Sequence, residues 1–174
     1  MIKNISNLGD AAVYCDFGVE VNEKINSNVI IYFNHLKNLI NRNKIDGIIN
    51  LTPSYNKLII SFDLKISNFS KIKNLIQNLN ITNNLNIDNQ KIEIPVCCDD
   101  EYALDFDRLI KKLNLTKDEI LKNYFSKEYF CYMTGFIAGM PFLGNLNEKI
   151  RCERLETPRV KVPKGSIGIT EEFT

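Results

Sequence analysis

The sequence predicts an α+β fold. Short apolar runs alternate at the spacing of strands, longer runs recur at the spacing of helices, and the two kinds follow one another as β-α-β-β-α-β over the first 98 residues. After that point helices come first and short strands follow, so the elements are segregated along the chain. We therefore expect two domains, at residues 1–98 and 99–174.

The first domain opens with a strand pattern at residues 11–17. A helix follows, with apolar positions at three- and four-residue intervals: Ile25, Val29, Tyr32, Phe33, Leu36, Leu39 and Ile40. Two short strands are expected at residues 47–51 and 57–62, separated by the turn-like Thr52-Pro53-Ser54.

A second helix is marked by Ile72, Leu75, Ile76 and Leu79, with Ser67 as a candidate cap. The alternating run at residues 91–97 predicts the final strand of the domain. The resulting order is that of a ferredoxin-like βαββαβ unit.

The second domain is expected to begin with helices. Leu104, Leu109, Ile110 and Leu113 mark one, and Thr116 with Glu119 forms the capping box of another. From Glu128 onward, short strand-like runs are separated by glycine and proline, which is typical of a β-barrel.

Composition excludes several classes of protein. Basic and acidic residues nearly balance (22 against 21), which leaves no electrostatic footprint for nucleic acid. No run approaches the roughly 18 apolar residues of a membrane span, and the N-terminus lacks the apolar core of a signal peptide. The five cysteines show no CxxC spacing and there is one histidine, so we expect reduced thiols, no metal site and a cytoplasmic location.

Residues 132–166 stand out because they combine glycines, prolines, aromatics and arginines in a pattern that core packing does not require. Glycine allows sharp turns and close approach of the backbone to a ligand. Arg154 and Arg159 lie near Pro158 and Pro163, and guanidinium forks on stiffened chain suit a planar anion such as a carboxylate or phosphate. The pattern predicts a binding site.

Several motifs carry a family resemblance. GFIAGMPFL (residues 135–143), TPR (157–159) and VPKGSIGI (162–169), with LGDAAVYCDFG (8–18) and KIEIPVCCDDEYALDFDRL (91–109), resemble the family of 5-oxoprolinase B subunits, also called KipI-like or allophanate hydrolase subunit 1. The resemblance implies that the barrel is cyclophilin-like. Two departures stand out: Tyr124 occupies the place of a family histidine, and the sequence stops before a Ser-Pro-Gly-Gly-Trp motif. We therefore expect a barrel that is incomplete at its C-terminal end.

The resemblance implies one component of an ATP-dependent lactam hydrolase that opens 5-oxo-L-proline to L-glutamate. The implied partners are the C-type subunit of 5-oxoprolinase, which is a second allophanate-hydrolase-type protein, and the A-type subunit. The implied cofactor is ATP with Mg²⁺. No GxxxxGK[ST] loop occurs, so ATP would use another cradle or a partner. Two alternatives stay open: a regulator that inhibits a sensor histidine kinase, and an inactive degenerate copy.

The candidate catalytic residues are Glu128, as a base or hydrogen-bond acceptor, and Arg159. The candidate substrate- or nucleotide-binding residues are Phe136, Pro141, Phe142, Arg154, Arg159, Gly165 and Ser166. Each has a simpler interpretation: core aromatics for Phe136 and Phe142, surface arginines for Arg154 and Arg159, a tight turn for Gly165-Ser166, and a solvated carboxylate at a strand edge for Glu128. Ser166 is a poor nucleophile, since no histidine lies nearby in sequence to activate it.

Overall fold

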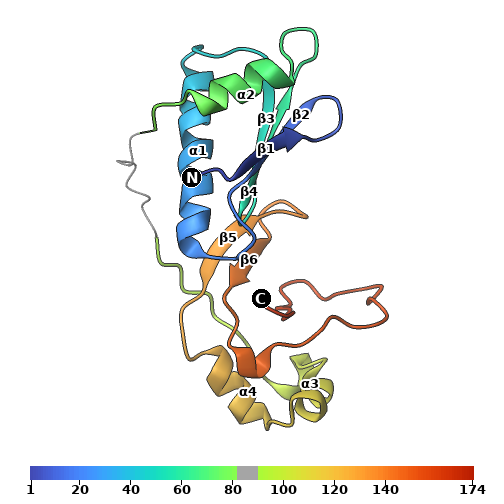
Figure 1. The fold of residues 1–174 in the computed structure, drawn as a ribbon. Helices are drawn as coiled ribbons and strands as arrows, with labels where there is room; N and C mark the ends of the chain where they lie inside the picture. The colour runs from blue at the N-terminus through green and yellow to red at the C-terminus, as the bar shows by residue number, and fades with distance from the viewer. Residues whose placement is uncertain (82–89) are drawn as a thin grey trace. The chain divides into compact units, whose positions relative to one another are not determined.

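The computed structural model describes residues 1–81 and 90–174 and shows an α+β protein (Figure 1). The chain divides into two compact units, Met1–Asp88 and Asn89–Thr174. The boundary predicted at residue 98 stays a prediction.

The first unit is built on a four-stranded antiparallel sheet of order β1-β2-β4-β3. Its strands are β1 (Asn4–Asn7), β2 (Ala12–Asp16), β3 (Ile48–Pro53) and β4 (Lys57–Phe62). Alternation places the apolar side chains of β2 and β4 on one face, where Val13 lies opposite Ile60 and Cys15 opposite Leu58. The strand prediction for residues 11–17 is confirmed to within one residue at each end.

Two helices cover that apolar face. Helix α1 (Glu23–Asn41) begins at Asn22, whose side chain accepts from the backbone N–H of Lys24 and Ile25, and α2 (Phe69–Gln77) begins at Asn68. The cap of α2 is therefore Asn68, one residue after the predicted Ser67. Buried Val29, Leu36, Ile72 and Ile76 join the sheet side chains in one hydrophobic cluster.

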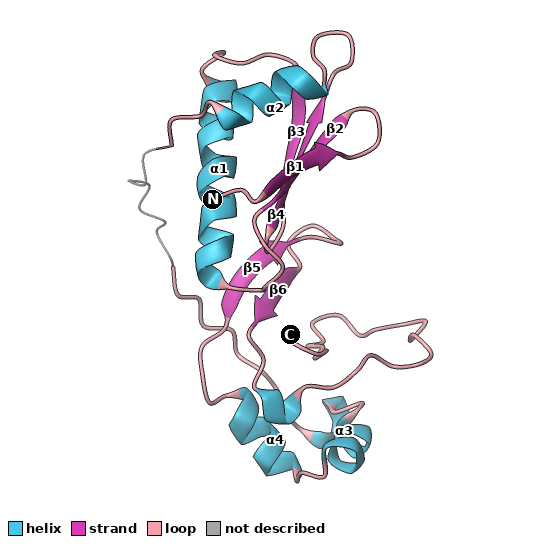
Figure 2. Cartoon of the chain, viewed as in Figure 1, coloured by secondary structure: helices cyan, strands magenta, loops and turns pink. Residues whose placement is uncertain are grey.

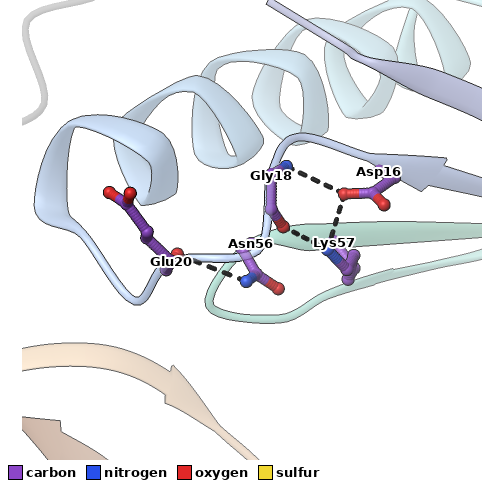
Figure 3. A network of polar contacts seen from close by, with 5 residues as sticks. All are labelled: Asp16, Gly18, Glu20, Asn56 and Lys57. Atoms are coloured by element: carbon purple, nitrogen blue, oxygen red, sulfur yellow. Dashed lines mark hydrogen bonds and ion pairs between the residues drawn. The ribbon is translucent and has the colours of Figure 1, made fainter.

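A polar network closes one end of this sheet (Figure 3). The Lys57 ammonium pairs with Asp16 at 2.5 Å and donates to the carbonyl oxygen of Gly18, while the Asn56 amide donates to the carbonyl oxygen of Glu20 at 3.3 Å. The hydrogen bond from Lys57 holds the pKa of the Asp16 carboxyl below its usual range. The network ties the end of β2 to the β3–β4 turn at Ser54–Asn56, later in the chain than the predicted turn.

The prediction of a ferredoxin-like βαββαβ order is wrong at its last strand. Residues 91–97 form no strand, and Ile92 and Ile94 are 76% and 64% exposed. In a βαββαβ unit the last strand would pair with the first, but β1 occupies the edge of β2 instead. Alternation predicts an extended backbone, whereas pairing also requires the backbone groups of a neighbouring strand, and residues 91–97 belong to the second unit.

The second unit begins with η1 (Asp100–Tyr102), α3 (Phe106–Leu113) and α4 (Lys117–Tyr124). The predicted capping box of α4 is confirmed: Thr116 Oγ1 accepts from the Glu119 backbone N–H, and the Glu119 carboxylate accepts from that of Thr116. Strands β5 (Phe130–Thr134) and β6 (Pro141–Gly144) pair antiparallel, and η2 (Glu148–Ile150) follows. The buried core here consists of Leu109, Ile120, Leu146, Ile150 and Cys152.

The predicted cyclophilin-like barrel is not found among the described residues. The second unit holds a two-stranded sheet, β5–β6, with isolated bridges from Phe173 to Gly144 and Thr170. Residues 153–169 run as a loop (Figure 2), and nearly all their side chains are exposed. A barrel requires tilted strands that are hydrogen-bonded to one another all the way around, and this loop contributes no strand.

Within the described residues, no helix combines the length and apolar character needed to cross a membrane.

Candidate functional site

The aromatic candidates lie on the β5–β6 hairpin. Phe136 sits in the connecting loop with φ of 64° and is 91% exposed. Pro141 begins β6 and is exposed, and Phe142 is half-buried opposite Met133. Phe136 is therefore a loop side chain in this structure and not a core aromatic.

Gly165 and Ser166 form a tight turn. The backbone N–H and the hydroxyl of Ser166 both donate to the carbonyl oxygen of Pro163, at 3.2 and 2.7 Å, and Gly165 has φ of 82°. Positive φ at the third position of such a turn favours glycine. Both donors of Ser166 are thus used within the turn, which matches the simpler interpretation of this pair.

Glu128 lies just before β5 and forms an ion pair with Lys91, with the Nζ and Oε1 atoms 2.5 Å apart. Both side chains are well exposed, so the pair is screened by water. This geometry matches the simpler interpretation of a solvated carboxylate.

Helix α3 contacts the arginine-bearing loop at several points. Asp105, at the N-terminal end of α3, forms an ion pair with the Arg159 guanidinium. Arg108 donates to the carbonyl oxygens of Glu153 and Arg154 at 3.0 and 3.5 Å. The sequence interpretation missed Asp105 and Arg108. Their three-residue spacing on a predicted helix indicates that the two charged side chains share one face, which was a usable signal.

Lys112 is the third charged contact of this helix. It forms an ion pair with Glu153, and the hydrogen bond from Lys112 holds the pKa of the Glu153 carboxyl below its usual range. Arg154 differs from Arg108 and Lys112, because its guanidinium makes no hydrogen bond or ion pair with any residue in the described ranges.

A groove of about 590 Å³ runs between α3 and the start of the loop. The cations on its wall are Arg108, Lys112 and Arg154, and Glu153, Glu156 and Thr157 also line it. Of the predicted site residues only Arg154 lines the groove, with Arg159 two positions beyond Thr157; the others do not. Guanidinium and ammonium donors around an open groove suit a small anion.

Over residues 1–81 and 90–174 no group of three or more His, Cys, Asp or Glu side chains is arranged to hold a metal ion.

Comparison with known proteins identifies the family. The family model described as carboxyltransferase domain, subdomain C and D, matches residues 3–174. This chain belongs to the carboxyltransferase C and D family. The resemblance of its motifs to the B subunit of 5-oxoprolinase is also confirmed.

Curated relatives of this carboxyltransferase-family chain are named as the B subunit of 5-oxoprolinase. The protein from Bacillus subtilis (strain 168) is 29% identical over 177 residues, covering 95% of this chain and 72% of the relative. The protein from Haemophilus influenzae is 41% identical over 78 residues, covering 45% of this chain and 37% of the relative.

A solved structure supports the fold of this family member. The crystal structure of TTHA0988 matches with a TM-score of 0.77 at 22% identity, covering 94% of this chain and 31% of that one. The chain thus spans less than a third of the TTHA0988 chain. At this identity the likeness supports the fold alone.

Proposed function

We propose that this chain is the B-type component of an ATP-dependent 5-oxoprolinase, which hydrolyses 5-oxo-L-proline to L-glutamate. The observation that carries the proposal is the 29% identity with the 5-oxoprolinase B subunit of Bacillus subtilis across 95% of the chain. A cytoplasmic location belongs to the same proposal.

The arginine-lined groove provides the chemistry for binding such a substrate. 5-Oxoproline carries one carboxylate, and a guanidinium can grip a carboxylate through two parallel hydrogen bonds. Arg154 is available for this role because its side chain makes no contact of that kind with the described residues. We assign Arg159 to the same anion.

Opening the lactam requires activation, because an amide is a poor electrophile until its carbonyl oxygen becomes part of a leaving group. Two observations support placing ATP and Mg²⁺ on a partner: the sequence has no GxxxxGK[ST] loop, and no group of three or more His, Cys, Asp or Glu side chains in the described residues is arranged to hold a metal ion. Our proposal therefore puts ATP and Mg²⁺ on a partner, either the C-type or the A-type protein. Glu128 would accept a hydrogen bond or a proton, and its Oε2 atom is not used by the ion pair with Lys91.

The test is reconstitution of the complex. The chain is co-expressed with A-type and C-type proteins, and glutamate formation from 5-oxo-L-proline is measured with and without ATP. We expect activity that depends on ATP and on all three chains, and that falls at least tenfold when Arg154 is changed to Ala, for loss of a charge-assisted contact. Arg42→Ala is the matched control, an exposed arginine in the first unit. A complex that assembles but forms no glutamate would refute the proposal.

A further inference from the structure

The loop that carries Arg154 and Thr157-Pro158-Arg159 has little structure of its own. Residues 153–159 form no helix or strand, and only Leu155 among them is not exposed. Ordering such a segment costs conformational entropy for every residue fixed. Something outside the loop must therefore hold the arginines in place if they are to bind a ligand with useful affinity.

Helix α3 supplies that hold. Asp105, Arg108 and Lys112 follow one another at intervals of three and four residues, which places them along one face of the helix. Asp105 contacts Arg159, Arg108 contacts the carbonyl oxygens of Glu153 and Arg154, and Lys112 contacts Glu153. The contacts therefore span both ends of the arginine-bearing stretch.

Asp105 contacts Arg159 and does not cap its own helix. It occupies the N-cap of α3, where an aspartate usually accepts hydrogen bonds from the first backbone N–H groups of the helix, yet its side chain makes no such bond. Its carboxylate faces Arg159 instead. A residue that departs from its usual local preference in favour of a distant partner is a candidate for a functional role.

The contact leaves Arg159 able to bind an anion. A guanidinium has five N–H donors in a rigid fork, and the contact with Asp105 uses the Nη2 nitrogen. The second Nη2 hydrogen remains for a ligand and can form a two-pronged contact together with the adjacent Nη1 or Nε donor. Asp105 thus orients the fork without using it up.

We propose that Asp105, Arg108 and Lys112 form a clamp on α3 whose function is to position Arg154 and Arg159 for an anionic ligand. This inference rests on the proposed anion-binding role of the groove, and it assigns positioning roles to three residues that are not among the candidate site residues predicted from sequence.

The test measures anion binding by the full chain. Titration calorimetry at an ionic strength of about 0.15 M, where the field of a distant charge is largely screened, follows binding of 5-oxo-L-proline and, separately, of inorganic phosphate. Asp105→Ala removes the carboxylate without removing a capping bond, Asp105→Glu restores the charge, and Asp107→Ala is the control from the exposed side of the same helix. The initial rate of tryptic cleavage after Lys161 reports loosening of the loop.

We expect Asp105→Ala to raise the Kd of the anion that the wild-type chain binds by about two- to five-fold, the range for an exposed ion pair, and to accelerate cleavage. Asp105→Glu should restore both values, with melting temperature unchanged throughout, and Asp107→Ala should alter neither. Faster cleavage with unchanged Kd, or a lower Kd, would overturn the clamp. If the wild-type chain binds phosphate but not 5-oxoproline, the proposed function fails while phosphate still tests the clamp; binding of neither overturns both.

Discussion

Cys15 lies at the centre of the first unit's sheet and has no exposed surface. Burial raises the pKa of its thiol from 9.0 to about 12, because a thiolate there would lose its hydration. Such a group behaves as a small apolar side chain and not as a nucleophile. Its neighbour in sequence, Asp16, is part of the polar network at the end of the same sheet.

Stability should fall as the pH rises above about 9. Between pH 9.0 and about 12 the unfolded chain loses the Cys15 proton while the folded chain keeps it, so the free energy of unfolding decreases by at most about 1.4 kcal/mol per pH unit from this group. Chemical denaturation at pH 8, 9 and 10 measures the slope. Cys15→Ala should make it shallower, whereas Cys97→Ala, at an exposed position, should not.

Arg159 is expected to matter more for ligand than for folding. Arg159→Lys keeps the positive charge, so an ion pair with Asp105 can persist, but it loses the planar two-pronged fit to an anion. In the assembled complex we expect substrate binding to weaken by about 1–3 kcal/mol with little change in melting temperature. A much lower melting temperature with normal binding by the remaining folded protein would make Arg159 a structural residue.

At the scale of elements, helix termini show how local chemistry sets the layout. Asn22, Asn68 and Thr116 each cap a helix through a side-chain oxygen, whereas the N-cap Asp105 of α3 does not. Helix α4 is short, so satisfying its first backbone N–H groups contributes a large share of its stability. Helix α3 depends more on packing through Leu109 and on its contacts with the loop.

Thr116→Ala should destabilise the second unit by about 1 kcal/mol, because it removes the oxygen that accepts from the Glu119 backbone N–H. Urea denaturation followed by circular dichroism measures the change. Ser70→Ala, at an exposed position of α2, is the control and should change stability by less than about 0.5 kcal/mol. Equal effects of the two substitutions would contradict a stabilising role for the capping box.

At the scale of the whole molecule, each unit has its own hydrophobic core, yet many large apolar side chains remain outside both. Ile92 and Ile94 alternate along a segment that forms no helix or strand, and Val160 and Val162 lie on the exposed loop. Unpaired extended backbone with apolar side chains favours association with another chain.

We therefore expect the isolated protein to self-associate as its concentration rises. Ile92→Lys combined with Ile94→Lys should reduce association, because charges on an extended segment oppose strand pairing. Lys3→Glu in the first unit is a surface-charge control that should have little effect. Static light scattering provides the molar mass across concentrations, and a wild-type monomer at every concentration would contradict the prediction.

The sequence by itself determined the features that depend on neighbours along the chain. Apolar periodicity located β2, β4 and the two long helices, Thr116 and Glu119 predicted the capping box, and the motifs from residue 135 to 169 indicated the family. These signals are local because side-chain period and capping chemistry are set within a few residues.

Only the tertiary structure decided which segments meet. Residues 91–97 have the alternation of a strand but form none, and β1 takes the place beside β2. Arg159 could be singled out from sequence, yet its partner Asp105 lies 54 residues away. Strand pairing and ion pairing both depend on which groups the folded backbone brings within a few ångströms, and the spacing of residues along the chain does not contain that information.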